Sequence, residues 1–472
     1  MTDVAVFGAT ACGVMAAVAA RAAGADVVLV EPGRHVGGMV SGGLSWTDVG
    51  DTRVLGGLAR RFYQAVADQY CAPLWALRGP EPHVAEQLLE GMLDGVDVRL
   101  GERELPDAAV VVDASYEGDA LAAAGVPYAV GRESRDLHGE RWAGRQPAYR
   151  PSRHNFPVLL DPFEEDGSLL PGIRPPELDE QGWPAERLGE GDGGLQAYGY
   201  RVCLTHADER VPFERPADYD EREFALLHRY LDASGDATPL GLVRDLLPNE
   251  KCDVNSIGPV SLNVLDASNR DYPDGDEEAR ERVREHHRRY TRGFLWTLAE
   301  RGLLDGWGFP PDEFDGGLPH QLYVREGRRL QGAHVLTEHD LAAARPHDDV
   351  VALGSYNVDI REVERTWRFL PEYERTAAVF NEGYLSVAVP TYSIPYRALT
   401  PRREHAENLL VPLCLSASHV AFSSVRMEPT LMLLGQAAGT AAAQAARRGV
   451  AVQDVDVAQL QDDLRDAGAV LT

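Results

Sequence analysis

The sequence predicts an α/β fold, in which a parallel sheet is flanked by helices and interrupted by an inserted α+β region. Two apolar tracts and the polar stretch between them support this prediction. The first 31 residues run through an apolar strand, a glycine-containing turn, an alanine-rich helix and a second apolar strand, the pattern of a βαβ unit of about 30 residues. A second apolar tract, rich in small residues, occupies residues 409–447. The stretch between the two tracts is polar and rich in proline, glycine and charge.

Each element of the N-terminal unit follows from its residue types. Short apolar runs of β-forming residues predict strands, and the alanine-rich segment predicts a helix that ends near Gly24. The expected bounds are a strand at 4–7, a turn at 8–13, a helix at 14–23 and a strand at 27–30. Glu31 ends the second strand.

The remaining elements are expected from periodicity and residue type. They are helices at 58–70 and 83–93, strands at 96–100, 110–112 and 409–411, an exposed helix at 277–301, a polar loop at 416–428 and a small-residue helix at 429–446. Residues 145–196 show little periodicity and predict no regular element. We therefore expect a discontinuous domain at 1–135 and 345–472, with the inserted domain at 136–344.

Composition argues against several classes of function. The net charge of −28 makes nucleic acids and acidic membranes poor partners. No run of about 18 apolar residues lacks a charge, which predicts no membrane-spanning helix, and no basic segment precedes the first apolar run. We therefore expect a cytoplasmic protein. The five cysteines include no CxxC pair, and no His/Cys cluster has zinc spacing, so we expect neither a disulfide framework nor a metal site.

The turn of the βαβ unit nearly matches the G-x-G-x-x-G pattern of dinucleotide-binding proteins. Gly8 allows the tight turn, and Gly13 lets helix and strand pack closely, so that the helix N-terminus offers N–H groups to a pyrophosphate. Thr10 replaces the middle glycine; its side chain narrows the approach of a phosphate, although its hydroxyl can donate to one. Glu31 can accept hydrogen bonds from a ribose diol, and its charge disfavours the 2′-phosphate of NADP.

Two glycine pairs after Glu31 favour FAD over NAD. Gly37-Gly38 and Gly42-Gly43 let the backbone approach a cofactor that continues beyond the pyrophosphate. The alternative is that they form flexible surface turns. No second G-x-G-x-x-G follows a strand, so a built-in NAD(P)H site is not predicted.

Eight blocks of sequence carry a resemblance to a known family. They lie at residues 8–13, 31–44, 112–121, 200–205, 248–255, 319–326, 393–397 and 414–429. In these blocks the chain resembles the bacterial FAD-dependent oxidoreductases that are often labelled xanthan lyase-like. Their FAD-binding core is shared with glutathione-reductase-type and fumarate-reductase-type flavoproteins. Thr10 is the residue that this family has in the middle position. One departure is the short 101–109 connection, where such flavoproteins usually carry a β-meander.

The resemblance implies a non-covalent FAD site built from both ends of the chain. Residues of the first turn would face the pyrophosphate, Glu31 the adenosine ribose, and the 416–432 segment the isoalloxazine. There, the helix N-terminus at Pro429 would stabilise negative charge on reduced flavin. An alternative, covalent attachment through His35, rests on analogy with the fold alone. The implied cofactor-binding residues are Gly8, Thr10, Ala11, Cys12, Gly13, Glu31, Pro32, Gly37, Gly38, Met39, Ser41, Gly42, Gly43, Leu44, Ala114, Ser115, Glu117, Asp119, Ser418, Glu428, Leu431 and Met432.

Five polar residues in these blocks are candidates for catalysis: His419, His320, Arg325, Tyr396 and Arg426. His419 could act as a base or hydrogen-bond the flavin; otherwise it is a structural histidine. His320 and Arg325 could bind a carboxylate or a polar diol, or belong to an ion-pair network between domains. Tyr396 allows the same two readings, and Arg426 could instead pair with Glu428.

These features predict an enzyme that oxidises a small polar metabolite. The cofactor would accept a hydride at flavin N5 while a nearby base takes a proton. A first alternative is an FAD-dependent monooxygenase that uses an external reductant. A second is a non-catalytic flavin-binding protein, against which the polar clusters at 319–329 and 416–428 argue. The expected partner is a small-molecule substrate, and the electron acceptor and oligomeric state are left open.

Overall fold

A parallel sheet with the strand order β16-β4-β1-β2-β3 forms the centre of one lobe. The computed structural model describes residues 2–77, 79–180, 184–235, 245–370 and 376–472. The elements of this lobe are β1 (Thr2–Phe7), α1 (Ala11–Ala22), β2 (Val27–Glu31), α2 (Gly57–Gln69), α3 (Pro82–Met92), β3 (Asp97–Leu100), β4 (Ala108–Asp113), α4 (Asp119–Ala123), β16 (Leu409–Leu410), α9 (His419–Val425), α10 (Glu428–Arg448) and α11 (Val457–Asp466).

The remaining elements are divided between the second lobe and the side of the first lobe that packs against α10 and α11. They are β5 (Tyr128–Val130), α5 (Arg135–His138), β6 (Val202–Thr205), α6 (Ala225–Ser234), β7 (Asp245–Leu246), β8 (Lys251–Val254), α7 (Glu277–Glu300), β9 (Arg328–Leu330), α8 (Glu338–Ala343), β10 (Val350–Gly354), β11 (Val358–Ile360), β12 (Glu364–Leu370), β13 (Thr376–Glu382), β14 (Leu385–Val387) and β15 (Tyr392–Pro395). Strands β5 to β15 pair in small antiparallel sheets. Thus the predicted α/β class, with a parallel sheet and an added α+β region, is confirmed.

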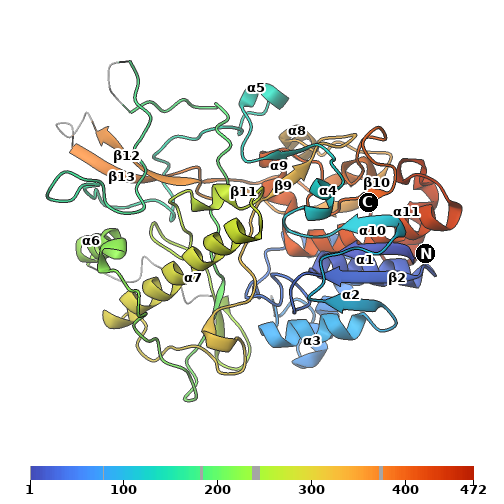
Figure 1. The fold of residues 1–472 in the computed structure, drawn as a ribbon, viewed down its shortest axis with the longest axis horizontal. Coiled ribbons are helices and arrows are strands. Elements are labelled where there is room, and N and C mark those ends of the chain that lie inside the picture. Colours follow the sequence, from blue (N-terminus) through green and yellow to red (C-terminus); the bar gives the residue numbers. More distant parts are fainter. Residues whose placement is uncertain (1, 78, 181–183, 236–244, 371–375) are drawn as a thin grey trace.

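Helices α1 and α10 pack along each other beside the sheet, although about 400 residues of chain separate them (Figure 1). Two glycines of α10 make this contact close. A Cβ on Gly435 would lie 2.1 Å from the carbonyl oxygen of Cys12, and one on Gly439 would lie 2.0 Å from that of Ala16. Backbone therefore touches backbone, which fixes the N-terminus of α10 next to the first turn of the chain.

The opposite face of the sheet has a much smaller covering. Phe7, Val28 and Val30 form a separate apolar cluster there, against which Leu105 packs. Leu105 lies in the 101–107 connection between β3 and β4, so this short loop takes the place of the β-meander that the resemblance would supply.

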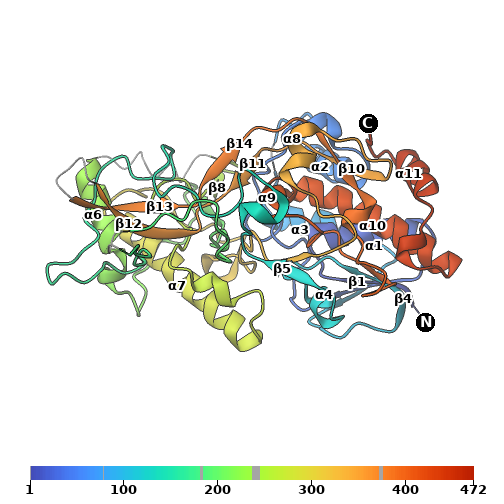
Figure 2. The same ribbon diagram turned by 90° about the horizontal axis from the view of Figure 1, so that it is seen from above.

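One part of the expected 345–472 segment lies outside the sheet lobe. The β12–β13 hairpin extends into the second lobe with α6 and α7 (Figures 1 and 2). The Val379 amide donates to the Leu160 carbonyl at 3.1 Å, and the Arg174 amide to the Arg365 carbonyl at 2.8 Å. The second lobe is thus built from two chain segments, and the hairpin gives the irregular 145–175 stretch a surface to pack on.

Two local expectations also change. The 416–428 segment, predicted as a loop, contains α9, because the Ser418 hydroxyl accepts a hydrogen bond from the Ala421 amide and caps a short helix. Helix α7 is amphipathic and not simply exposed, since Val283, Phe294 and Leu298 are buried. Between α5 and β6 the described residues form only isolated bridges, as the lack of periodicity predicts.

A buried lysine joins the lobes near α3. Lys251, the chain's single lysine, donates to Glu81 at 2.7 Å, Asp312 at 2.7 Å and Glu313 at 2.6 Å. Three ammonium protons therefore meet three carboxylates, which compensates the burial of the charge.

No helix among the described residues is long and apolar enough to cross a membrane.

The glycine contact between α1 and α10 yields a stability prediction. Gly435→Ala places a methyl group against the Cys12 carbonyl, so we expect the free energy of unfolding to fall by about 1–3 kcal/mol despite the better helix propensity of alanine. The matched control is Gly91→Ala in α3, where a Cβ meets nothing within 4 Å and stability should rise slightly. Thermal denaturation of both variants checks this; equal effects of the two substitutions would contradict the packing argument.

Candidate functional site

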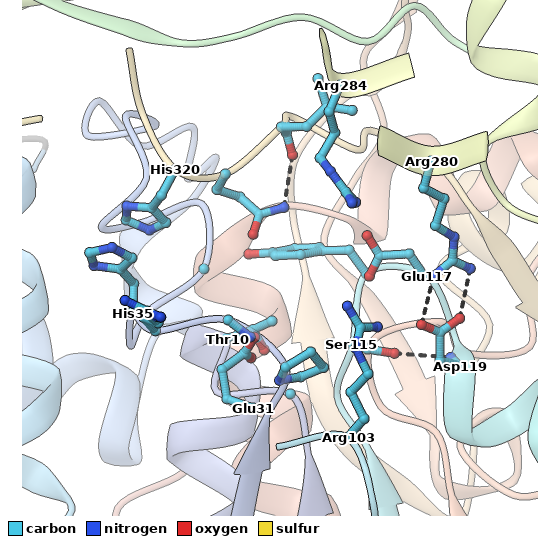
Figure 3. A pocket seen from close by; sticks show the side chains of 18 of the residues that line it. Thr10, Glu31, His35, Arg103, Ser115, Glu117, Asp119, Arg280, Arg284 and His320 are labelled. Carbon is cyan, nitrogen blue, oxygen red and sulfur yellow. Dashed lines mark hydrogen bonds and ion pairs between the residues drawn. The ribbon is translucent and has the colours of Figure 1, made fainter. Parts of the chain in front are cut away.

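A deep cleft lies at the carboxyl ends of β1, β2 and β4, the edge at which open α/β sheets bind ligands (Figure 3). It has a volume of about 400 Å³ and is open to solvent. We call it the outer cleft. Its lining from the sheet lobe comprises Phe7, Gly8, Thr10, Glu31, Pro32, Gly33, Arg34, His35, Gly38, Arg103, Ser115, Tyr116, Glu117 and Asp119.

The first turn has the shape that the sequence predicts. Gly8 has φ +96°, and a Cβ there would lie 2.9 Å from the Ala114 carbonyl. A Cβ on Gly13 would lie 1.9 Å from the Gly8 oxygen, so both positions require glycine. The first amides of α1, on Ala11 and Cys12, have no partner within the helix and form an anion-binding end.

Thr10 has a different role from the expected one. Its hydroxyl accepts a hydrogen bond from the Gly13 amide at 3.1 Å and donates to the Ala114 carbonyl at 2.8 Å. A hydroxyl has one proton, so in this arrangement Thr10 does not donate to a phosphate. It caps α1 and ties the first turn to the segment after β4.

Glu31 closes the bottom of the outer cleft (Figure 3). Its two carboxylate oxygens accept hydrogen bonds from the Ala9 amide at 2.7 Å and the Gly33 amide at 2.6 Å. Burial raises the pKa of the carboxyl, and these hydrogen bonds oppose that rise. Each oxygen keeps a further lone pair, so Glu31 is placed to accept hydrogen bonds from a ribose diol.

The segment after β4 forms a second wall. Asp113 accepts hydrogen bonds from the Ser115 hydroxyl at 2.6 Å and the Leu121 amide at 2.7 Å, while burial raises its pKa to about 6. Glu117 is buried in the same wall and accepts a hydrogen bond from Tyr272 at 3.0 Å. Its pKa rises to about 7, first through burial and then through the charge of Asp119.

The second lobe supplies arginines that sequence reasoning missed. Arg280, Arg284 and Arg288 follow one another at helical spacing along α7 and line the outer cleft. Arg280 grips Asp119 with two bonds of 2.7 Å (Figure 3), and Arg328 adds a third of 2.9 Å. The i, i+4, i+8 repeat was the available signal, but within a highly charged helix it resembles an ordinary solvated face.

His320 lies at the mouth of the outer cleft and not beside the 416–432 segment. Its ring stacks on His35, with centroids 4.0 Å apart and planes 11° apart (Figure 3). Burial, and then the neighbouring His35, lower its pKa to about 3, so His320 is neutral near neutral pH. The structure therefore separates His320 from Arg325, which the sequence placed in one block.

A second, smaller space lies beyond Tyr116. This inner cavity is narrow, with a volume of about 10 Å³, and Tyr116 lines both it and the outer cleft. The Tyr116 hydroxyl donates to Glu428 Oε1 at 2.7 Å and accepts from the Met39 amide at 2.9 Å. The lining consists of Met39, Leu44, Tyr116, Tyr323, Val324, Arg325, Glu326, Gly327, Leu413, Phe422, Arg426, Glu428 and Leu431.

Glu428 is the first residue of α10 and faces this cavity with an unused acceptor. Its Oε2 is buried and has no hydrogen-bond partner. Burial raises the pKa of the carboxyl to about 7, while the hydrogen bond from Tyr116 opposes the rise. An orphaned acceptor at a helix N-terminus suits a ligand that carries hydroxyl donors.

Arginine side chains gather on the other side of the inner cavity. Arg426 donates to the Tyr323 hydroxyl at 3.1 Å and to Asp359 Oδ2 at 3.3 Å, so the pair with Glu428 that sequence allowed is wrong. Arg325 lies over the Tyr323 ring at 4.2 Å and donates to the Ala197 carbonyl and to Asn263 Oδ1 at 3.4 Å. Burial lowers the pKa of Arg325 to about 9.

Two of the catalytic candidates, His419 and Tyr396, line neither the outer cleft nor the inner cavity. His419 is bonded to Glu326 at 2.8 Å, and Glu326 lines the inner cavity. Tyr396 donates to the Val452 carbonyl at 2.8 Å and lines a separate cavity with Arg397 and Asp349. Arg397 and Asp349 form an ion pair of 2.9 Å there.

Several residues expected at the cofactor make close contacts within the protein. A Cβ on Gly42 would lie 2.4 Å from Gln321 Cβ, and one on Gly43 would lie 1.9 Å from the Arg201 carbonyl. The two glycines therefore allow residues of the second lobe to approach the backbone closely. The Ser41 hydroxyl donates to the Val36 carbonyl at 2.6 Å. The residues expected to touch FAD that line neither space are Ala11, Cys12, Gly13, Gly37, Ser41, Gly42, Gly43, Ala114, Ser418 and Met432.

The fold and the cleft define a dinucleotide-binding α/β protein. The family model "FAD dependent oxidoreductase" matches residues 3–105 and 96–464. The chain therefore belongs to this family, and FAD is its cofactor.

Comparison with solved structures found weak overall similarity. The OxyS anhydrotetracycline hydroxylase from Streptomyces rimosus is 17% identical over 28% of this chain and 38% of its own, with a TM-score of 0.22. The Thermovibrio ammonificans THI4 is 16% identical over 28% and 66%, with a TM-score of 0.21. The T. acidophilum thioredoxin reductase is 14% identical over 30% and 39%, with a TM-score of 0.16. The matched parts thus span less than half of the hydroxylase and of the reductase. No curated protein matches the chain.

The buried Glu428 carboxyl gives a pH prediction for the FAD-free protein. Because its folded-state pKa of about 7 exceeds the ordinary 4.5, its contribution is intact below pH 4.5 and is lost as pH rises through 7. The loss approaches about 3 kcal/mol. Glu428→Gln keeps the acceptor for Tyr116 and removes the ionisation, so the variant should gain in melting temperature relative to wild type between pH 5 and pH 8. Parallel pH profiles for the two proteins would contradict this prediction.

Proposed function

We propose that this protein oxidises a small polar metabolite that carries an anionic group, which Arg325 and Arg426 hold beside the flavin. The observation that carries the proposal is the environment of Arg325. Among the described residues its hydrogen-bond acceptors are neutral oxygens, although the side chain is 4% exposed or less and lines the inner cavity. A buried cation without a carboxylate partner is costly, and an anionic substrate group would compensate it.

The two spaces suggest how the cofactor is held. We place the adenosine at Glu31, the pyrophosphate at the first turn of α1, and the isoalloxazine in the inner cavity next to the N-terminus of α10. Glu428, with its unused Oε2, would accept hydrogen bonds from the ribityl hydroxyls. The inner cavity is too small for the ring system as it stands, so a cofactor that occupies both spaces must widen it. It must also displace the Tyr116 phenol, which lies between the two spaces, from Glu428.

His35 is poorly placed for a covalent bond to the flavin ring. It lines the outer cleft, where its Nδ1 lies 3.1 Å from Glu86 and its ring stacks on His320. A flavin in the inner cavity would be separated from it by Tyr116. We therefore propose that FAD is bound non-covalently.

Tyr323 is the side chain best suited to accept a proton. Burial would raise its pKa, but the adjacent charges of Arg426, Arg325 and Arg201 reverse that effect and lower it. FAD, when bound, supplies a two-electron acceptor that takes a hydride at N5. The Tyr323 oxygen would take the proton of the substrate O–H or N–H, and Arg426, which donates to that oxygen, would stabilise the phenolate.

The experiment is anaerobic bleaching of the bound flavin by a panel of small hydroxy and amino compounds, each tested with a free carboxylate and as its neutral amide. We expect the carboxylates to bleach the flavin and the amides to be much weaker. Bleaching by NAD(P)H alone, followed by incorporation of oxygen into a substrate, would replace this proposal with the monooxygenase alternative. Failure of every compound and of both nicotinamides would support a non-catalytic protein.

Variants separate substrate binding from proton transfer. Arg325→Gln should weaken binding of the carboxylate substrate about 10- to 150-fold, because a charge-assisted hydrogen bond is lost. Tyr323→Phe should slow bleaching about 10²- to 10⁴-fold with a smaller change in KM. Matched controls outside the site are Arg365→Gln, also buried among neutral acceptors, and Tyr290→Phe, which removes a bond to the Ser261 carbonyl. If the control variants lose as much substrate binding and bleaching rate, misfolding would explain the losses, and the roles assigned to Arg325 and Tyr323 would be contradicted.

A further inference from the structure

Two histidines and an aspartate converge beside α8, outside both the outer cleft and the inner cavity. The ring nitrogens of His334 and His347 and the carboxylate of Asp340 lie within 4.8 Å of one another. His334 precedes α8, Asp340 lies on it and His347 follows it. The spacing of six and seven residues falls outside the short His and Cys patterns of known zinc motifs, so no sequence motif predicts the cluster.

The distances within the cluster are those of ligands around an ion. His334 Nε2 lies 3.7 Å from Asp340 Oδ2, and His347 Nε2 lies 3.6 Å from Asp340 Oδ1. Both separations exceed a hydrogen bond. Ligands of a tetrahedral zinc ion at about 2.0–2.2 Å stand roughly 3.4 Å apart, which is close to both values.

The two imidazoles offer unused lone pairs. His334 Nε2 and His347 Nε2 are buried, and neither has a hydrogen-bond partner among the residues that the structure describes. The His347 side chain is 10% exposed, and the His334 side chain 26%.

The carboxylate is held in place by hydrogen bonds. Asp340 Oδ2 accepts hydrogen bonds from the Thr337 amide at 2.9 Å and the Thr337 hydroxyl at 3.0 Å, which forms a capping box. Second-shell hydrogen bonds of this kind orient a metal ligand.

The other acidic cluster provides a contrast within the same chain. Glu81, Asp312 and Glu313 also converge, but they surround the Lys251 ammonium, which is their cation. Among the residues that the structure describes, no arginine or lysine pairs with Asp340, whose two ion-pair contacts are the histidines. Among the described residues, the two imidazoles and the carboxylate therefore have no cation between them, in contrast to the acidic cluster.

We propose that His334, Asp340 and His347 bind one divalent first-row transition-metal ion, with zinc as the ion that the tetrahedral spacing suits. Three protein ligands leave a fourth position for water. The residues next to two of the ligands, Ala333 and Asp348, line a solvent cavity of about 490 Å³ from which water can enter. The ion would clamp the two loops that flank α8.

This clamp would also hold the strand-like contact beside α9. Leu336, between two of the ligands, exchanges backbone hydrogen bonds with the 416–418 segment, 2.9 Å to the Ser416 carbonyl and 2.8 Å from the Ser418 amide. The proposed ion is thus structural and does not depend on the proposed redox activity.

The test uses the full-length, FAD-loaded protein, stripped with a chelator and titrated with zinc chloride in a calorimeter. We expect one zinc per chain, and X-ray absorption at the zinc edge should report nitrogen and oxygen ligands without sulfur. His347→Ala and His334→Gln should each weaken binding more than about 100-fold, because a direct ligand is lost. His334→Gln alters the more exposed ring, so at least one variant should fold normally.

His339→Ala is the matched control. His339 lies on the same helix, but its ring faces the His138 carbonyl at 3.2 Å and is not part of the cluster. It should bind zinc like wild type. Retained FAD absorbance in all variants confirms folding. No zinc binding by the wild type, or the same affinity in the two ligand variants as in the control, would overturn the proposal; the latter would place the ion at another cluster.

Discussion

The close contact between α1 and α10 is the constraint on which the site depends. Gly435 and Gly439 carry no side chain where the carbonyl oxygens of Cys12 and Ala16 approach, so the two helices meet backbone to backbone. The first turn of the chain and the start of α10 are thereby brought together. The first turn lines the outer cleft, and the start of α10 lines the inner cavity. Tyr116 lines both spaces.

Ion pairs connect the two lobes. Although the chain carries a net charge of −28, arginines line both spaces, and most of those arginines are paired with carboxylates. Asp119 is bound by Arg280 and Arg328, and Lys251 is caged by three acids. Buried pairs of this kind add little net stability, but a missing partner is expensive, so they fix the position of the second lobe on the sheet. Arg325, held by neutral oxygens only, stands apart from this pattern.

The fold of the sheet lobe could be predicted because its signals are local. Period, glycine position and small-residue content gave β1, α1, β2 and α10, and both Gly8 and Gly13 have the predicted steric role. The roles of Thr10 and of the Gly42-Gly43 pair could not be predicted, since they depend on what approaches them: the Ala114 carbonyl in one case and Arg201 and Gln321 in the other.

The site was harder to predict because its chemistry is assembled across the chain. His419 and Tyr396 lie in polar blocks, yet their partners turn out to be Glu326 and a backbone carbonyl. Arg280, Arg284 and Arg288 looked like solvated charge until α7 was placed against the sheet lobe. The pKa of Tyr323 is lowered by Arg325, two positions away, and by Arg426 and Arg201, each more than 100 positions away in the sequence. No local pattern shows that these three arginines meet at one phenol.

The most direct test of this account is a crystal structure of the protein with FAD bound. The account predicts the adenosine ribose within hydrogen-bond distance of Glu31, the isoalloxazine among Tyr323, Arg325 and Arg426, and the Tyr116 phenol turned away from Glu428. An isoalloxazine that remains in the outer cleft, with the hydrogen bond between Tyr116 and Glu428 intact, would contradict it.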